Sequence, residues 1–297
     1  MPWYELNSAD DPKLDELAAR YNLHPLHLED ARATDERVKV DQVESYTFAV
    51  LKPVRLVPAG SGGESSVSFS TIDIFAGVQG GEPFFITIAD PTCPTTAEAL
   101  ARARREGVDD KPARLLYLIV DTIVDLYFPA IDYYDDRIDE LEDQVIARPE
   151  PDTLQRVFTL KRQLIDMRRV FVGTRDATLH LQRDPRSIVD AEHQPFVRDV
   201  YDHVVRLLDS VETQRDLVNN ALDIYLSSVA NRTNEVMKVL TVLGTIALPA
   251  IAISGIYGMN LKGLPFEDSV HGAAYVAGLT VVCTVGLLVL LKRRHWF

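Results

Sequence analysis

Cysteine is scarce in this chain, whose 297 residues contain only Cys93 and Cys283. The two cysteines lie far apart in the sequence, and Cys283 falls inside an apolar stretch. This usage predicts neither a disulfide framework nor a thiolate metal site, and it fits a reducing compartment.

Basic residues are a minority among the charged side chains. The chain has 31 lysines and arginines against 44 aspartates and glutamates, a net charge of −13. The acid excess lies in residues 1–238, because residues 239–297 carry more bases than acids. An acidic surface repels phosphate backbones, so we expect no nucleic-acid partner and favour small cations instead.

Sequence motifs of the common enzyme classes are also missing. The chain has no HExxH pair, no nucleophile elbow, no glycine-rich cofactor fingerprint and no GxxxxGK[ST] phosphate loop. The run Pro-Ala-Gly-Ser-Gly-Gly at 58–63 is more typical of a hairpin loop. The sequence therefore argues against an enzyme, an organic cofactor and an ATP-driven process.

Two uncharged stretches stand out near the end of the chain, residues 239–257 and 272–291, and each is long enough to cross a bilayer. Arg232 and Lys238 precede the first stretch and bases at 292–294 follow the second. The positive-inside rule then predicts cytoplasmic ends and an outer connection. The start MPWYELNSADD has no signal-peptide pattern, so we expect a multi-pass plasma-membrane protein with a cytoplasmic head.

The pattern of apolar residues predicts three parts. Residues 1–110 combine short strand-like runs with short helices, which predicts a mixed α/β cytoplasmic domain. Residues 111–238 follow a helical period and predict a cytoplasmic stalk of long helices. Residues 239–297 predict a transmembrane hairpin with an outer loop at 258–271. The strand-like runs are 3–6, 45–56, 67–75 and 83–89, and the short helices are 11–21, 25–32 and 95–104.

The stalk is predicted to contain three helices. Apolar periodicity runs from about residue 114 to 145, and a second helix is expected from 152 to 181. The third is the longest, because residues 196–243 contain neither glycine nor proline. That stretch alone would make a rod of about 72 Å, continuous with the first membrane span.

One face of the first span is small or weakly polar. Steps of seven residues along two adjacent rows give Ser227, Asn234, Thr241, Leu248 and Gly255, and Asp223, Ala230, Met237, Gly244 and Ile251. Helix packing in the membrane is one explanation, since small residues and threonine are common there. The face continues down to Asp223 and Asn220, however, and such polar groups suit a water-filled axis better. Two spans cannot enclose a pore, so such an axis requires a ring of several copies.

The first span ends in Tyr257-Gly258-Met259-Asn260. A Gly-Met-Asn triplet at the outer end of the first of two C-terminal spans, behind an acidic head, resembles the signature of the CorA family of divalent-cation transporters. The likeness extends over residues 24–30, 198–203, 222–228 and 233–240 and the basic-aromatic C-terminus, which together span essentially the whole chain.

The resemblance implies a funnel-shaped homopentamer with an outer selectivity filter made by Gly258, Met259 and Asn260. Neutral amide oxygens can bind a hydrated or partly hydrated magnesium ion without trapping it. It also implies a pore and gate lined by seven residues of the stalk and first span. These are Asp223, Asn234, Met237, Leu240, Thr241, Leu248 and Gly255.

The acids implied by the resemblance fall into two groups. Asp30, Asp199, Glu29 and Asp121 match regulatory magnesium ligands between neighbouring subunits, although each alone would be read as part of a solvated helix face. In the outer loop, Glu267 and Asp268 are expected to attract ions. The loop departs from the family's frequent Met-Pro-Glu-Leu, since this chain has Leu-Pro-Phe-Glu at 264–267.

The function implied is channel-like uptake of Mg²⁺, with Co²⁺ and Ni²⁺ as further candidate ions. Mg²⁺ would be the transported ion, driven inward by the membrane potential. It would also be the regulatory ion, which closes the pore when it is bound between subunits. A Zn²⁺ transporter of the same superfamily, with or without proton coupling, is the alternative. A membrane-anchored enzyme and a passive coiled-coil scaffold are less consistent with the sequence, because the first lacks a catalytic motif and the second leaves the polar residues of the span unexplained.

Overall fold

The computed structural model of the chain describes residues 1–33, 36–57, 66–106, 111–147, 150–259, 265 and 269–294. Two compact units make up the chain, Met1–Leu222 and Asp223–Phe297. Helix α7, Gln194–Gly258, begins in the first unit and ends in the second.

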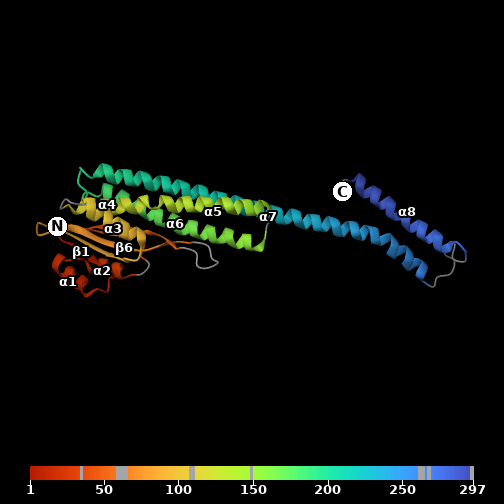
Figure 1. Cartoon of the computed structure of the whole chain (residues 1–297), viewed down its shortest axis with the longest axis horizontal. Helices are drawn as coiled ribbons and strands as arrows, with labels where there is room; N and C mark the ends of the chain where they lie inside the picture. The colour runs from red at the N-terminus through yellow and green to blue at the C-terminus, as the bar shows by residue number, and fades with distance from the viewer. Residues whose placement is uncertain are drawn as a thin grey trace. The chain divides into compact units, whose positions relative to one another are not determined.

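A five-stranded sheet forms the centre of the first unit, with strand order β1-β7-β6-β3-β2 (Figure 1). Strand β1 is parallel to β7, and the other neighbours are antiparallel. A separate pair, β4 and β5, is also antiparallel. The strands are β1 Trp3–Leu6, β2 Lys39–Gln42, β3 Tyr46–Leu51, β4 Val54–Val57, β5 Ser66–Phe69, β6 Ile72–Gln79 and β7 Glu82–Ala89.

Three features of the sheet differ from the sequence prediction. The run 45–56 divides into β3 and β4 at Pro53, whose missing N–H cannot extend a ladder. The run 67–75 divides into β5 and β6, because its two halves pair in different sheets. Strand β2 was not predicted, since its four residues include two charged side chains and its apolar alternation is too short to detect.

One face of the sheet is covered by α1, Pro12–Tyr21, and α2, Pro25–Arg32. Helix α1 starts where the Asp11 carboxylate accepts a hydrogen bond from the Lys13 N–H, and it ends at Asn22 in the left-handed conformation, with φ of 49°. Its buried face packs on the aromatic side chains of the sheet, with Tyr21 stacked on Phe84 at a centroid distance of 4.1 Å. This core fixes the position of α2, which carries two of the predicted regulatory acids.

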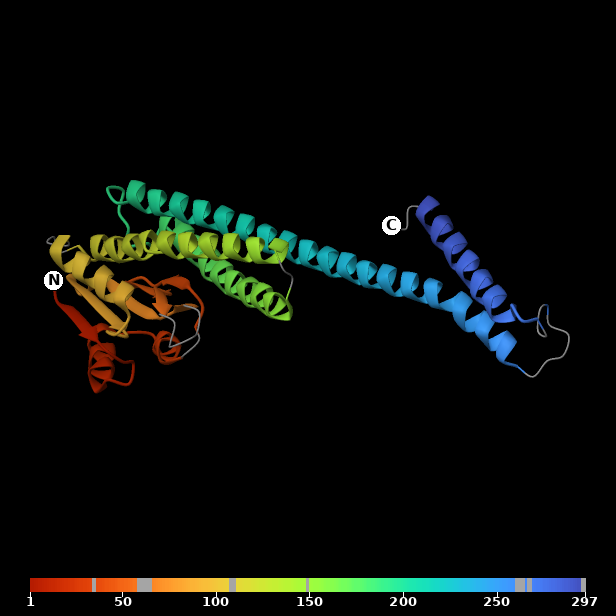
Figure 2. The same ribbon diagram turned by 45° about the vertical axis from the view of Figure 1, so that its right-hand side comes forward.

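Long helices complete the first unit. They are α3 Pro94–Glu106, α4 Pro112–Asp125, α5 Phe128–Ala147 and α6 Pro151–Arg183. The predicted helix 114–145 is in fact two helices, because Pro129 has no N–H to continue the ladder from Asp125. In both views α5 and α6 lie beside the first part of α7 (Figure 2). Gln214 of α7 donates to the Ile131 carbonyl of α5 at 3.0 Å, which ties these helices together.

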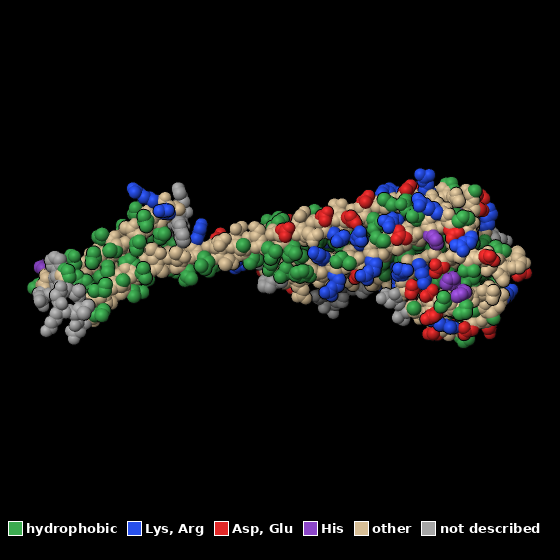
Figure 3. All heavy atoms as spheres, turned by 180° about the vertical axis from the view of Figure 1, so that it is seen from behind, with side chains coloured by type: hydrophobic (Ala, Val, Ile, Leu, Met, Phe, Trp, Pro, Cys, Tyr) green, Lys and Arg blue, Asp and Glu red, His purple; other side chains and the backbone are tan. Residues whose placement is uncertain are grey.

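The second unit consists of the end of α7 and α8, Gly272–Arg293. Helix α7 has 65 residues and would measure about 98 Å at 1.5 Å per residue. Pro249 lies inside it without ending it. Both helices are long and apolar enough to cross a membrane, and their apolar windows are 6% and 0% buried. Hydrophobic side chains crowd the surface of this unit, whereas acids and bases intermingle over Met1–Leu222 (Figure 3).

Candidate ion pathway and regulatory acids

The predicted pore face of α7 is exposed in the single chain. Asp223, Asn234 and Gly255 are exposed, and Thr241 is partly buried. The apolar members of this face, Met237, Leu240 and Leu248, have exposed fractions of 55%, 63% and 65%. Leaving such side chains in water costs roughly 1.5–3 kcal/mol each relative to burial. The described residues of the chain do not supply that burial.

The glycines of α7 have open space beside them in the described part of the chain. A Cβ atom added at Gly244, Gly255 or Gly258 would find nothing within 4 Å. Small residues in membrane helices usually mark a close approach of something else. Among the described residues, the chain makes no such approach to these glycines.

The predicted filter is described in part. Gly258 ends α7, and the Met259 N–H donates to the Ile256 carbonyl at 3.3 Å. The Tyr257 hydroxyl donates to the Pro265 carbonyl at 3.1 Å, which links the end of the helix to the loop that follows. Asn260, Glu267 and Asp268 lie outside the described residues.

Helix α2 is fixed by a buried hydrogen-bond relay. The Tyr46 hydroxyl accepts the His24 N–H at 2.8 Å and is also hydrogen-bonded to His27 Nδ1 at 2.8 Å. The His27 ring is stacked on Phe48 at 4.7 Å between centroids. Burial lowers the pKa of His27, although Asp41 opposes the shift, so the neutral ring is favoured.

The two acids on α2 have different surroundings. Glu29 is exposed, whereas the Asp30 carboxylate lies 2.7 Å from the Lys39 ammonium. Lys39 also contacts Glu36 at 3.0 Å. Burial alone would lower the pKa of Lys39, but its bonds to Asp30 and Glu36 outweigh burial and raise that pKa. Asp30 therefore already has a cationic partner within the chain.

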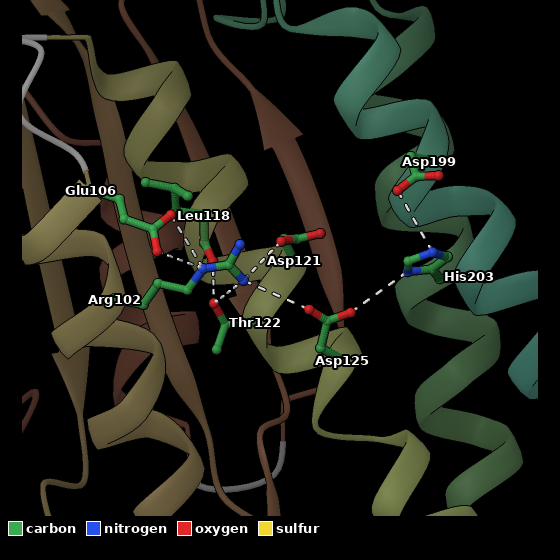
Figure 4. A network of polar contacts seen from close by, with 8 residues as sticks. All are labelled: Arg102, Glu106, Leu118, Asp121, Thr122, Asp125, Asp199 and His203. Carbon is green, nitrogen blue, oxygen red and sulfur yellow. Dashed lines mark hydrogen bonds and ion pairs between the residues drawn. The ribbon is translucent and has the colours of Figure 1, made fainter.

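Asp121 on α4 is also paired with a base. Its side chain is almost fully buried, and its Oδ2 lies 2.9 Å from Arg102 Nη1 of α3 (Figure 4). The same Arg102 Nη1 donates to the Thr122 hydroxyl at 3.1 Å. Burial and the nearby Asp125 raise the pKa of Asp121, and Arg102 acts against both.

Asp199 on α7 is exposed and joins the same network through a histidine. Its Oδ2 lies 3.6 Å from His203 Nε2, and His203 Nδ1 lies 3.7 Å from Asp125 of α4. In Figure 4 the dashed contacts lead from Asp121 through Arg102, Asp125 and His203 to Asp199. Among the described residues, no hydrogen bond or ion pair joins Glu29 or Asp30 to either end of this path.

The sequence reasoning missed Arg102, Asp125 and Lys39. A signal for Asp125 was present, because residues four apart on a helix share a face and Asp125 is four residues after Asp121. Arg102 and Lys39 had no comparable signal, since their pairing depends on how separate elements pack. The carboxylate oxygens of the four predicted acids are ligands that Mg²⁺ prefers, so the donor chemistry fits a divalent cation.

A second acidic group lies where α7 begins. Ligand atoms of Asp190, Glu192 and His193 lie within 4.8 Å of one another. Asp190 accepts from the His193 N–H at 3.0 Å and contacts its ring at 2.5 Å, and Lys111 pairs with Glu192 at 2.9 Å. The bond from His193 lowers the pKa of Asp190. These contacts explain why the three side chains lie close together: they stabilise the start of α7.

The chain combines an acid-rich unit with two helices that are long and apolar enough to be candidate membrane spans, which makes it a candidate membrane protein. Comparison with known proteins identifies its kind. The model of the family described as CorA-like Mg²⁺ transporter protein matches residues 1–293, and the chain belongs to this family.

Individual relatives agree with this assignment. The cobalt/magnesium transport protein CorA of Thermotoga maritima is 37% identical over 280 residues, which cover 93% of this chain and 77% of that protein. The complete structure of the CorA magnesium transporter from Methanocaldococcus jannaschii has the same fold, with a TM-score of 0.78 and 24% identity over 99% of this chain and 91% of that one. The zinc transport protein ZntB of Yersinia enterocolitica is 25% identical over 60% of this chain and 54% of its own length.

Proposed function

We propose that the chain assembles as a homopentamer and forms a channel for Mg²⁺ uptake across the plasma membrane, with both ends in the cytoplasm. Membership in the CorA-like Mg²⁺ transporter family supports the class of substrate. The observation that carries the channel proposal is the unbroken helix α7, whose exposed face continues from Asp223 to Gly255. Inward movement needs no ATP, because a divalent ion gains about 4.6 kcal/mol per 100 mV of membrane potential.

The pore is proposed to lie along the axis of the ring, lined by one α7 from each copy. Asp223, Asn234 and Thr241 offer polar atoms to water along this axis. The Thr241 hydroxyl donates to the Met237 carbonyl at 2.7 Å, so its oxygen lone pairs stay available. Met237, Leu240 and Leu248 are proposed as an apolar constriction that excludes water when the channel is shut.

The selectivity filter is proposed at Gly258, Met259 and Asn260. A ring of neutral amide and carbonyl oxygens binds hydrated Mg²⁺ weakly enough for release. Glu267 and Asp268 would raise the local concentration of cations outside this ring.

Closure is proposed to follow from carboxylates that face one another between neighbouring copies, with Glu29 and Asp199 as the exposed donors and Asp30 and Asp121 beside them. Two carboxylates about 4 Å apart repel by about 1 kcal/mol in water and about 4 kcal/mol at an effective dielectric constant of 20. Summed over the interfaces of a ring of five copies, the larger of these values exceeds the ~5.5 kcal/mol that moves a population from 1:99 to 99:1. Bound internal Mg²⁺ would relieve this repulsion and favour the shut state.

Zinc transport is the second candidate, because a zinc transporter is among the relatives of the chain. That relative matches a smaller part of the chain than the cobalt/magnesium transporter does, at lower identity. Magnesium is therefore the favoured ion.

The test is ion flux into vesicles that contain the purified full-length chain. We expect Mg²⁺ uptake that follows an imposed potential and is independent of a proton gradient, with Co²⁺, Ni²⁺ and Zn²⁺ compared under the same conditions. Asn260→Ala should abolish selective uptake, whereas Ser269→Ala in the same loop should conduct normally. Zinc uptake that needs a proton gradient, with little Mg²⁺ uptake, would favour the second candidate. Normal selectivity in Asn260→Ala would refute the filter.

A further inference from the structure

Cys93 lies at the start of α3, and its side chain is fully buried. Its carbonyl accepts the Ala97 N–H at 3.0 Å, in the bond that opens the helix. The sulfur lies 3.2 Å from the Thr95 hydroxyl and 3.9 Å from the Val54 carbonyl of β4. A buried cysteine is usually an inert, small apolar residue, unless the groups around it favour the thiolate.

Two side chains beside this sulfur carry a donor that has no partner. The Thr96 hydroxyl is fully buried and meets no acceptor at hydrogen-bond geometry among the described residues. Arg55 of β4 bonds Asp90 at 2.6 Å and Thr92 at 3.0 Å through Nη2, whereas its buried Nε lacks a partner in the same part of the chain. Buried donors without an acceptor are rare in folded proteins and call for an explanation.

Both of these side chains favour the ionised form of Cys93. Burial alone would raise the pKa of the thiol, but hydrogen bonding by Thr95, Thr96 and Arg55 outweighs burial and lowers that pKa. The Thr96 N–H acts in the same direction, as expected at the start of a helix. The contact with Cys93 in turn raises the pKa of Arg55. A thiolate here would therefore supply an acceptor to donors that otherwise lack one.

We propose that Cys93 is a site of reversible oxidation by hydrogen peroxide, at which the thiolate becomes a sulfenic acid beside the Arg55 guanidinium. The sulfur attacks one peroxide oxygen, so an S–O bond forms as the O–O bond breaks. The sulfur loses two electrons, and the departing hydroxide takes up the proton that the thiol released, which gives water. The neighbouring Thr92 and Pro94 are exposed, so the sulfur lies close to the surface and within reach of an oxidant little larger than water.

The sequence around Cys93 favours a sulfenic acid that persists. Such a group ordinarily condenses with a second thiol or with a backbone nitrogen. The other cysteine of the chain, Cys283, belongs to the candidate membrane span α8, whereas Cys93 belongs to the first unit. The backbone nitrogen that follows Cys93 is that of Pro94, which has no N–H to exchange for a sulfur. Reduction by an external thiol is therefore the expected way back to the thiolate.

The experiment compares the same thiol in the folded and the unfolded chain. The full-length chain with Cys283→Ser, in detergent with or without guanidinium chloride, is exposed to hydrogen peroxide for a series of times. Peroxide is removed by desalting, and both samples are then unfolded in dimedone, which labels the sulfenic acid for mass spectrometry. Cys93 should react about tenfold faster in the folded chain. A rate in the folded chain that is equal to or below the rate in the unfolded chain would identify a structural thiol and overturn the proposal.

Substitutions assign the parts played by the two donors. Arg55→Gln and Thr96→Val should each slow the reaction of the folded chain about tenfold and leave that of the unfolded chain unchanged. Arg104→Gln is the matched control, since Arg104 is also on α3 but pairs with Glu5, and it should react like the parent chain. Unchanged rates in both Arg55→Gln and Thr96→Val would overturn the proposed site. If either variant does not fold, the comparison of folded and unfolded parent chain still decides the question.

Discussion

The two units of the chain differ in how they bury apolar side chains. In Met1–Leu222 the aromatic and aliphatic residues of the sheet and helices are buried by other parts of the same chain. In Asp223–Phe297 the apolar windows of α7 and α8 are 6% and 0% buried. The first unit is therefore stabilised from within, whereas the second needs lipid or other copies of the chain to cover it.

Because of this difference, we expect residues that determine stability and residues that determine ion transport to lie in different parts of the sequence. Substitutions in the core of the first unit should change its free energy of unfolding, and substitutions on the exposed face of α7 should change ion flux. Substitutions probe this separation, with effects that should decrease from Phe75→Ala to Arg168→Gln.

The largest effect is expected for Phe75→Ala in β6. Phe75 is fully buried and its ring contacts those of Tyr46 and Phe48 on β3, so its removal should cost about 3–5 kcal/mol of the free energy of unfolding. Urea unfolding of the full chain in detergent, followed by intrinsic fluorescence, measures this cost. Leu248→Ala, the matched control on α7, should change the same transition by less than about 0.5 kcal/mol. Equal costs would contradict the separation.

A pH effect is expected from Asp73 of β6, which is buried and whose Oδ1 has no hydrogen-bond partner among the described residues. Burial raises the pKa of Asp73 from 3.8 to about 8, against the opposing charges of Lys52 and Lys39. Because the folded-state pKa is the higher one, the stabilising contribution is complete below pH ~4 and is lost as the pH rises through ~8.

Asp73→Asn should remove this dependence. Between pH 5 and 8 the unmodified chain should lose about 2 kcal/mol or more relative to the variant. Urea unfolding at each pH measures the difference. Parallel pH profiles for the two proteins would show that Asp73 is ionised in the folded chain at neutral pH.

A smaller effect is expected for Tyr46→Phe, which removes the hydroxyl between His24 and His27. The free energy of unfolding should fall by about 1–2 kcal/mol, because the His24 N–H loses its acceptor. Hydrogen exchange should also quicken in α2, the helix that carries Glu29 and Asp30. Unchanged exchange there would show that the relay does not hold α2 in place.

The smallest effect is expected for Arg168→Gln. Arg168 pairs with Glu212 at 3.0 Å, and both side chains are exposed. Exposed ion pairs contribute about 0–1 kcal/mol, so the urea midpoint should move little. If Arg168→Gln lowered the free energy of unfolding as much as Tyr46→Phe does, the exposed Arg168–Glu212 pair would stabilise the helices more than we expect.

Much of the architecture followed from local sequence features. The absence of glycine and proline from 196–243 predicted a long helix into the first span, and α7 runs unbroken from Gln194 to Gly258. Local signals were insufficient where the chain changes direction within one periodic run, as at Pro53 and Pro129. The division at residues 110 and 238 stays a prediction.

The site was predicted less completely, because its charges are balanced by residues from other elements. Arg102 reaches Asp121 only because α3 packs on α4, and Lys39 reaches Asp30 only because β2 begins beside α2. The spacing of these residues in the sequence does not indicate that they form pairs. The roles of the pore, filter and regulatory residues stay predictions, including those of Asn260, Glu267 and Asp268 outside the described residues.

The central claim is that one face of α7 lines the ion path, and cysteine modification tests it most directly. Thr241 and Leu243 lie two residues apart in the first span and on opposite faces of the helix. Each is replaced by cysteine in a chain with Cys93→Ser and Cys283→Ser, and Mg²⁺ flux into vesicles is measured with a charged thiol reagent on both sides of the membrane. The reagent should block flux through Thr241→Cys and leave Leu243→Cys conducting, whereas equal block or equal flux would contradict a pore along this face.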